Sequence, residues 1–243
     1  MYPLIRNRRL RASESIRRLV RETTLSPDDF LVPLFVTEGK GIKEEIPSMP
    51  NYFRLSLDNL EKEAKELWKM GLCSVLLFVK VDDKLKDNKG TEALNPDGLM
   101  QRAIKTVKNA CPQMLVMTDV AMDPFSSYGH DGIVAEGQIL NDETAEVLAE
   151  MSVSHAKAGA DFVAPSDMMD GRILNIREAL EEEGFINTGI MAYSAKYASA
   201  FYGPFRDALD SAPVDIANVP KDKKTYQMDY ANRYEAIKET QMD

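Results

Sequence analysis

The sequence predicts an α/β fold in which parallel strands alternate with helices. Five short apolar runs, rich in β-branched and aromatic residues, recur along the chain, and segments with helical spacing separate them. The chain has 243 residues, of which 44% are hydrophobic, and this is enough for one large core. Strands joined through helices form parallel βαβ units, so we expect one domain built on a parallel sheet.

The five predicted strands follow one another at intervals that leave room for helices. They are FLVPLFV (30–36), CSVLLFV (73–79), QMLVMTDV (113–120), ADFVAPS (160–166) and GIMAYS (189–194). This spacing is typical of a βα barrel, and an open doubly wound sheet would show much the same pattern. No glycine fingerprint follows any of the strands, which weakens the case for a dinucleotide site.

The clearest helix is predicted at 141–158. Asn141 or Asp142 is the expected N-cap, acidic residues fill the first turn, and Gly159 is the expected end. Leu148 and Met151 lie at helical spacing on its apolar face. This helix would connect the third and fourth strands.

A basic arm, residues 1–22, precedes the barrel domain of residues 23–243. Its arginines are Arg6, Arg8, Arg9, Arg11, Arg17, Arg18 and Arg21. Such an arm is usually solvated or packed on a neighbouring subunit. The whole chain is nevertheless acidic, with 30 Lys and Arg against 39 Asp and Glu. That balance argues against a nucleic-acid partner and against an anionic membrane surface.

The cysteine count and the apolar runs indicate the compartment. Cys73 and Cys111 provide neither a disulfide framework nor a zinc quartet, which favours a reducing environment. No apolar stretch is long enough for a membrane span, and the arginine-rich start lacks the apolar centre of a signal peptide. We therefore expect a cytoplasmic protein.

Polar residues stand where the predicted strands end. They are Lys80, Asp119, Ser166, Asp167 and Lys196. In a βα barrel the chemistry is located at the carboxyl ends of the strands. A lysine attacks a carbonyl only when burial or a nearby cation disfavours its charge, and Lys196, with Arg206 one short helix away, is placed to meet both conditions. The alternative is an ordinary surface lysine with a buried stem.

Three loop segments carry further candidates. TDVAMDPFSSYGHDG (118–132) contains Asp123 and Asp131, whose oxygens suit magnesium, although turn-forming aspartates would look alike. In APSDMMDGR (164–172), Asp167 or Asp170 is either a site residue or a helix cap. DKKTYQMD (222–229) contains two lysines that would either bind a carboxylate or remain solvated.

Together, APSDMMDGR, YSAKYASAFYGPFRDA, DVAMDPFSSYGHDG and TYQM resemble the porphobilinogen synthase (δ-aminolevulinic acid dehydratase) family. The resemblance is colinear from about residue 3 to 240. It implies a TIM (βα)8 barrel whose N-terminal arm embraces a neighbouring subunit, in a homo-oligomer that is commonly an octamer. It also implies the condensation of two 5-aminolevulinate molecules to porphobilinogen, with loss of two waters, in tetrapyrrole biosynthesis.

The resemblance assigns roles to residues of this chain. Lys196 is similar to a Schiff-base lysine, and Asp119 and Ser166 are similar to the polar partners of its substrate, with Asp119 suited to proton transfer. The residues implied for the carboxylate of the second substrate are Arg206, Lys223 and Gln227, with Lys224 an open alternative to Lys223.

The resemblance also implies the metal. Many relatives bind zinc through three cysteines, at positions that here are Ala121, Asp123 and Asp131. We therefore expect no cysteine zinc site and a member of the magnesium-responsive branch, with Asp123 and Asp131 as candidate ligands. Glu239 matches the family's allosteric magnesium position.

The resemblance further implies a sixth strand with a second Schiff-base lysine, and two strands that close the barrel. The sequence stops at Asp243, before these elements. We therefore expect a truncated chain that lacks the last strands and is by itself poorly active or inactive. The alternatives are another lysine-dependent aldolase and a subunit that acts only in assembly.

Overall fold

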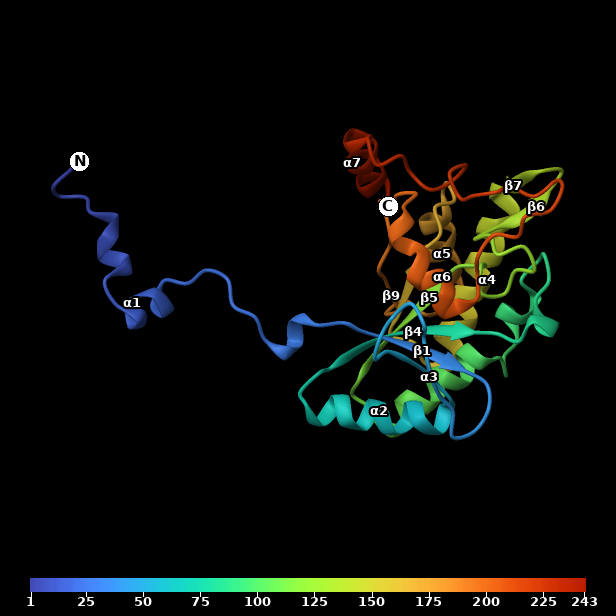
Figure 1. Cartoon of the computed structure of the whole chain (residues 1–243), viewed down its shortest axis with the longest axis horizontal. Coiled ribbons are helices and arrows are strands. Elements are labelled where there is room, and N and C mark those ends of the chain that lie inside the picture. The colour runs from blue at the N-terminus through green and yellow to red at the C-terminus, as the bar shows by residue number, and fades with distance from the viewer.

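A seven-stranded sheet forms the centre of the computed structural model, which describes residues 1–243 (Figure 1). Its strands are β1 (Val32–Thr37), β2 (Lys43–Glu45), β3 (Phe53–Leu55), β4 (Ser74–Lys80), β5 (Leu115–Val120), β8 (Phe162–Pro165) and β9 (Gly189–Ile190). The order is β2-β3-β1-β4-β5-β8-β9. Every neighbouring pair is parallel except β2 with β3. The predicted α/β class is therefore confirmed.

All five predicted strands are present, and the last is the most shortened. GIMAYS forms a strand only at Gly189–Ile190, the outer edge of the sheet. The chain nevertheless continues alongside β8, because the amides of Met191 and Tyr193 donate to the carbonyls of Val163 and Pro165. The strand pattern in the sequence did not indicate β2, β3 or the hairpin of β6 (Ile133–Ala135) and β7 (Gln138–Leu140).

The chain has seven α-helices. They are α1 (Glu14–Leu19), α2 (Leu57–Lys69), α3 (Leu99–Ala110), α4 (Asn141–Ala158), α5 (Arg172–Glu182), α6 (Gly203–Leu209) and α7 (Arg233–Met242). Of these, α2, α3, α4 and α5 connect parallel strands. The helix predicted at 141–158 is α4, and Gly159 ends it with a φ of 108°, a conformation that glycine adopts at little cost. Neither predicted N-cap is correct: Leu140 holds that position, and the side chain of Asn141 instead hydrogen-bonds Asp170. No helix has the length and apolar character that a bilayer crossing requires.

Alternate residues of the strands face two separate clusters. Leu34 and Leu77 belong to the larger cluster, where α2, α3, α4 and α5 cover the outer face of the sheet. Phe35 and Phe78 lie side by side in the register and face the inner cluster. Ala208 and Leu209 of α6 cover part of that inner face. Because side chains alternate along a strand, the same strands supply the core and the wall of the inner face.

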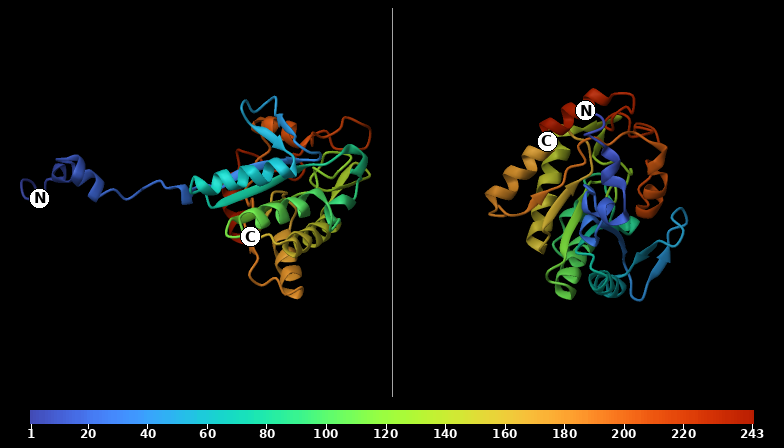
Figure 2. Two further views of the ribbon diagram at one scale, coloured as in Figure 1. Left: turned by 90° about the horizontal axis from the view of Figure 1, so that it is seen from below. Right: turned by 90° about the vertical axis from the view of Figure 1, so that its left-hand side faces the viewer.

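The N-terminal arm projects away from this body (Figure 2). None of its residues from 1 to 26 is buried, including those of α1. The Cys73 thiol donates to Asp28, 3.7 Å away, and the Ser74 hydroxyl donates to the carbonyl of Phe30. These contacts place the junction with the body a few residues after the predicted boundary at residue 22.

Candidate active site

Lys196 lies buried beyond the carboxyl end of β9, 8% exposed. Its amine donates to the carbonyl of Ser166, 2.5 Å away, and lies 3.8 Å from Oδ2 of Asp131. Ser166 directly follows β8, and its amide donates to the carbonyl of Val120 at the end of β5. The parallel register therefore brings these strand ends to one rim, where the sequence analysis expected the chemistry.

Two loops complete this rim: the aspartate loop, residues 121–132, and the lysine loop, residues 211–232. The amine of Lys223 lies between two carboxylates, 2.6 Å from Asp131 and 3.2 Å from Asp123. All three side chains are buried. Lys224 is exposed and pairs with Asp222 instead. The structure thus separates the two lysines that the sequence left as alternatives, and it puts Lys223 in the site.

Asp119 is a buried acid of the site with a raised pKa. Burial raises the pKa of its carboxyl to about 7, and the charge of Asp123 adds to the rise, while the Ser166 hydroxyl and Lys196 oppose it. Its Oδ1 atom is buried without a hydrogen-bond partner. An acid with a pKa near 7 exists in both protonation states at neutral pH, which is the property that proton transfer requires.

The Lys223 cluster is held by mutual charges. Burial would raise the pKa of Asp131, but Lys223 and Lys196 bring it below the usual value. Burial raises the pKa of Asp123 more than Lys223 lowers it. Burial would lower the pKa of Lys223, yet the two carboxylates raise it. Lys223 and Asp131 therefore form a charged pair, and the negative charge of Asp131 is already balanced by Lys223 when Lys196 approaches it.

His130 and Tyr226 tie the aspartate loop to the lysine loop. His130 Nδ1 lies 3.1 Å from the Tyr226 hydroxyl, and Nε2 lies 2.8 Å from the carbonyl of Pro220. The same hydroxyl accepts the amide of Asp131. The loops pass so closely that a Cβ on Gly129 would lie 2.2 Å from the carbonyl oxygen of Ala212. No role was predicted for Tyr226, because nothing local in the sequence shows that its hydroxyl reaches a histidine 96 positions away.

An apolar cavity of about 600 Å³ adjoins Lys196. Its walls are mainly aromatic and aliphatic, and Ser166 and Lys196 are polar groups among them. The aromatic side chains are Phe35, Tyr52, Phe78, Tyr193, Tyr202 and Phe205. The Lys196 amine also lies 5.4 Å from the centre of the Tyr202 ring. A small ligand that reached Lys196 would therefore be largely removed from water.

The other predicted substrate residues lie around this site and differ in whether their polar groups already have partners. Gln227 is buried on the lysine loop, and its side-chain oxygen has no hydrogen-bond partner. Arg206 on α6 is half-buried and makes no ion pair, although its charge acts on Tyr226. Lys80, the other lysine at a strand end, lies at the end of β4 beside Asp82 and Asp83 in a separate polar pocket. Gln227 and Arg206 thus retain groups that a ligand can satisfy.

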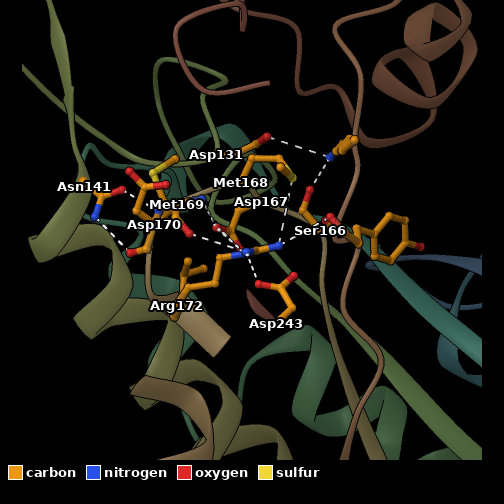
Figure 3. Close-up of polar contacts among 12 residues, drawn as sticks. Asp131, Asn141, Ser166, Asp167, Met168, Met169, Asp170, Arg172 and Asp243 are labelled. Carbon is orange, nitrogen blue, oxygen red and sulfur yellow. Dashed lines mark hydrogen bonds and ion pairs between the residues drawn. The ribbon is translucent and has the colours of Figure 1, made fainter. Parts of the chain in front are cut away.

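The structure adds a buried arginine that the sequence analysis missed (Figure 3). Arg172, the first residue of α5, pairs with Asp167 at 3.3 Å and with Asp243 at 3.2 Å. Burial raises the pKa of Asp167 to about 7, and Arg172 opposes the rise. Asp167 accepts the amide of Met169, so it shapes the turn before α5, whereas Asp170 is exposed. Arginines are rarely buried, but sequence alone did not mark this one.

The predicted magnesium positions differ in how well they fit a divalent ion. Asp123 and Asp131 do not fit, because the Lys223 ammonium contacts both and a second cation would meet its charge. Glu239 lies on α7 beside a polar cavity of about 370 Å³ that Asp170, Glu235, Asn141 and Asn232 also line. Oxygen donors of this kind suit magnesium. No three Asp, Glu, His or Cys side chains are close enough to form a full ligand set.

Comparisons with known proteins agree with the motifs of this rim. Residues 4–243 match the family model described as "Delta-aminolevulinic acid dehydratase". The curated protein of that name from Bradyrhizobium diazoefficiens is 49% identical over 239 residues, which are 98% of this chain and 67% of the relative. Its counterpart from Bacillus subtilis is 50% identical over 238 residues, 98% of this chain and 71% of the relative. The chain belongs to the delta-aminolevulinic acid dehydratase family.

A solved member of this family has the same fold. The crystal structure of delta-aminolevulinic acid dehydratase from Toxoplasma gondii ME49, in complex with the reaction product porphobilinogen, superposes with a TM-score of 0.92 at 50% identity. It is matched over 98% of this chain and 67% of that chain. The predicted βα barrel is confirmed by this likeness. Family membership also favours the dehydratase over another lysine-dependent aldolase.

Proposed function

We propose that this chain performs the dehydratase reaction, joining two molecules of 5-aminolevulinate to porphobilinogen, through an iminium on Lys196. The observation that carries the proposal is the buried amine of Lys196 at the strand rim, against the Ser166 carbonyl and in front of an apolar cavity. Asp119, with a pKa near 7, lies at the same rim. A lysine, an acid of matched pKa and a water-poor pocket are what Schiff-base chemistry needs.

In the first step, the neutral amine of Lys196 adds to the ketone carbon of one aminolevulinate. The carbonyl oxygen takes up a proton, and the resulting carbinolamine then loses its hydroxyl as water to leave the iminium. The iminium draws electrons from the neighbouring carbon and so allows that carbon to lose a proton. Over the whole reaction two waters leave and one pyrrole forms.

Asp119 is the proposed donor and acceptor of these protons, and Ser166 its partner. Its pKa of about 7 lets it give a proton to the departing hydroxyl and take one back at neutral pH. The Ser166 hydroxyl favours the charged form of Asp119. The Ser166 carbonyl holds the Lys196 amine. The two groups of Ser166 thus connect the acid with the nucleophile.

Arg206, Lys223 and Gln227 are the proposed groups for the carboxylate of the second substrate. Arg206 has no ion pair of its own, and Gln227 has an unpartnered oxygen. Lys223 is paired with Asp131 and Asp123, so the carboxylate of the substrate would share its ammonium with these two aspartates. An arginine can bind a carboxylate through two parallel hydrogen bonds, which also fixes its orientation.

Magnesium is the proposed metal, at Glu239 and not at Asp123 or Asp131. Glu239 and its neighbours offer one or two carboxylates to an ion that keeps most of its water, as magnesium prefers. Such an ion would neutralise the acidic face of α7 and leave the chemistry to Lys196. We further propose that the arm packs on a second copy in a homo-oligomer, commonly an octamer in this family, and that the protein works in the cytoplasm.

Reductive trapping tests the proposed role of Lys196. Treating the protein with 5-aminolevulinate and borohydride should reduce the iminium and leave a stable adduct on the peptide that contains Lys196. Mass spectrometry locates the adduct. Modification at other lysines alone would refute the assignment.

Lys196→Met should lower adduct formation and pyrrole formation, measured by a colour reaction, by at least about a thousandfold. Lys80→Met is the matched control, because Lys80 also ends a strand of the same sheet but lies in a different pocket. Its activity should remain within about twofold of the original protein. An unchanged rate in Lys196→Met would overturn the proposal.

A further inference from the structure

Arg172 is buried near the rim. Its guanidinium forms no ion pair with Asp119 or any other residue of the proposed reaction, but it bonds to the backbone segments that carry Ser166 and Lys196. It is only 2% exposed and is among the largest fully buried side chains. An arginine keeps its charge in a protein interior, so burying it is costly unless its donors are used. The number and direction of its contacts therefore point to a specific task.

The first set of contacts lies at the end of β8. Nε of Arg172 lies 3.3 Å from Asp167, and Nη1 lies 3.5 Å from the carbonyl of Met169. Asp167 in turn accepts the amide of Met169. These bonds hold the turn that begins with Ser166, the residue whose carbonyl receives the Lys196 amine.

The second set lies beyond β9. Nη2 of Arg172 donates to the carbonyl of Tyr193, 3.4 Å away and three residues before Lys196. The strand itself ends at Ile190, and beyond it the amides of Met191 and Tyr193 still donate to β8, so the contact with Arg172 adds a side-chain bond on the other side of the Tyr193 peptide. A third contact, 3.2 Å from Nη1 to Asp243, lies at the end of α7 (Figure 3). One planar guanidinium thus joins the turn after β8, the backbone after β9 and the end of α7.

We infer that Arg172 is a positioning residue, which fixes the Ser166 turn and the Lys196 segment relative to each other so that the amine faces the ketone of the substrate. This inference rests on the proposed function of Lys196. A displacement of about 1 Å in a reacting group can cost roughly a hundredfold in rate, so the lost contacts should be visible in the chemistry. Lysine cannot replace this arginine, because a single ammonium cannot reach the three segments at once.

Trapping of Lys196 by 5-aminolevulinate and cyanoborohydride tests the inference. Arg172→Ala should slow adduct formation at Lys196 by about 10- to 100-fold. Guanidinium ion at millimolar concentration should restore part of the rate by filling the vacated space, whereas urea or sodium ion should not. Arg172→Lys should remain slow without added guanidinium.

Arg177→Ala is the matched control on the same helix. Arg177 also bonds two backbone carbonyls, those of Phe185 and Thr188, but these lie in the connection between α5 and β9 and not in the Ser166 turn or the Lys196 segment. Its trapping rate should stay within about twofold of the original protein after both variants are shown by circular dichroism to be folded. Equal rates in Arg172→Ala and Arg177→Ala, or no rescue by guanidinium, would overturn the inference.

Amide hydrogen exchange gives a measurement that does not depend on the reaction. Arg172→Ala should speed amide exchange in residues 193–198. Arg177→Ala should leave the exchange rates of these residues unchanged. If the original protein formed no adduct at Lys196, the proposed function would fail, and the exchange rates would still decide the role of Arg172. Unchanged exchange in residues 193–198 would refute it.

Discussion

The arm, residues 1–26, and the lysine loop, residues 211–232, both contain little regular structure but are held very differently. No residue of the arm is buried, although it includes the short helix α1. The lysine loop has no helix or strand, yet it buries Ser211, Lys223, Gln227 and Met228. The loop is fixed because its Lys223 pairs with the buried carboxylates of Asp123 and Asp131. The comparison teaches that a buried ion pair can hold a segment of this protein that has no regular secondary structure.

Breaking the central ion pair of the lysine loop should have the largest effect. Lys223→Met leaves Asp123 and Asp131 buried without a cation, and this should lower the free energy of unfolding by about 3–5 kcal/mol. Urea unfolding measures the loss. Lys224→Met removes the exposed lysine that follows in the chain, and it should change the free energy of unfolding by no more than about 0.5 kcal/mol. Similar losses in the two variants would mean that the loop is not held by this pair.

Removing one hydroxyl of the loop should have a smaller effect. Tyr226→Phe deletes the partner of His130 and of the Asp131 amide, and it should cost about 1–3 kcal/mol of unfolding free energy. Tyr230→Phe is the control, because Tyr230 lies in the same loop and is 82% exposed. A loss confined to Tyr226→Phe in thermal unfolding supports the comparison, and equal melting temperatures contradict it.

The pH dependence of stability should distinguish the buried rim from the arm. Because burial raises the pKa of Asp119 to about 7, the folded state binds a proton that the unfolded state has released above its ordinary pKa of 3.8. The stabilisation of the folded state by this extra proton is fully present below pH 3.8 and is lost as the pH rises to about 7. Asp119→Asn should therefore reduce the fall in unfolding free energy between pH 4 and 7 by at least about 1 kcal/mol. Urea midpoints at several pH values measure it, and an unchanged slope would show that Asp119 has an ordinary pKa.

Deleting residues 1–22 of the arm should have the smallest effect on the stability of the body. Removal of residues 1–22 takes away no buried side chain, so the free energy of unfolding should change by no more than about 0.5 kcal/mol. The pH slope due to Asp119 should persist in full. If the arm packs on a second copy as proposed, light scattering should show a lower oligomer mass. A large loss of stability without a change in mass would reverse the comparison.

Local patterns were sufficient for the elements of the fold. The five apolar runs became β1, β4, β5, β8 and β9, and the helix with acidic start and glycine end became α4. Patterns were insufficient where an element is short or its partner is distant. The strands β2 and β3 have only three residues each, which is too few for a reliable alternation of apolar and polar residues.

The candidate site shows the same division. Lys196, Asp119 and Ser166 were predicted from strand ends and from the family resemblance, and the structure brings them to one rim. The Asp123 and Asp131 carboxylates were predicted to bind magnesium, and this stays a prediction. Their contact with the Lys223 ammonium argues against it. The sequence could not show that contact, since 92 positions separate Asp131 from Lys223.

The sequence by itself determined the five main strands, helix α4, the family and the residues whose chemistry suits a Schiff base, because periodicity and motif are local properties of a chain. Only the tertiary structure decided that Lys223 and not Lys224 enters the site, that Tyr226 joins two loops, and that Arg172 is buried behind Ser166 and Lys196. The physical reason is that burial and charge pairing depend on which distant segments meet. Those meetings set the pKa of Asp119 and the charge around Lys196.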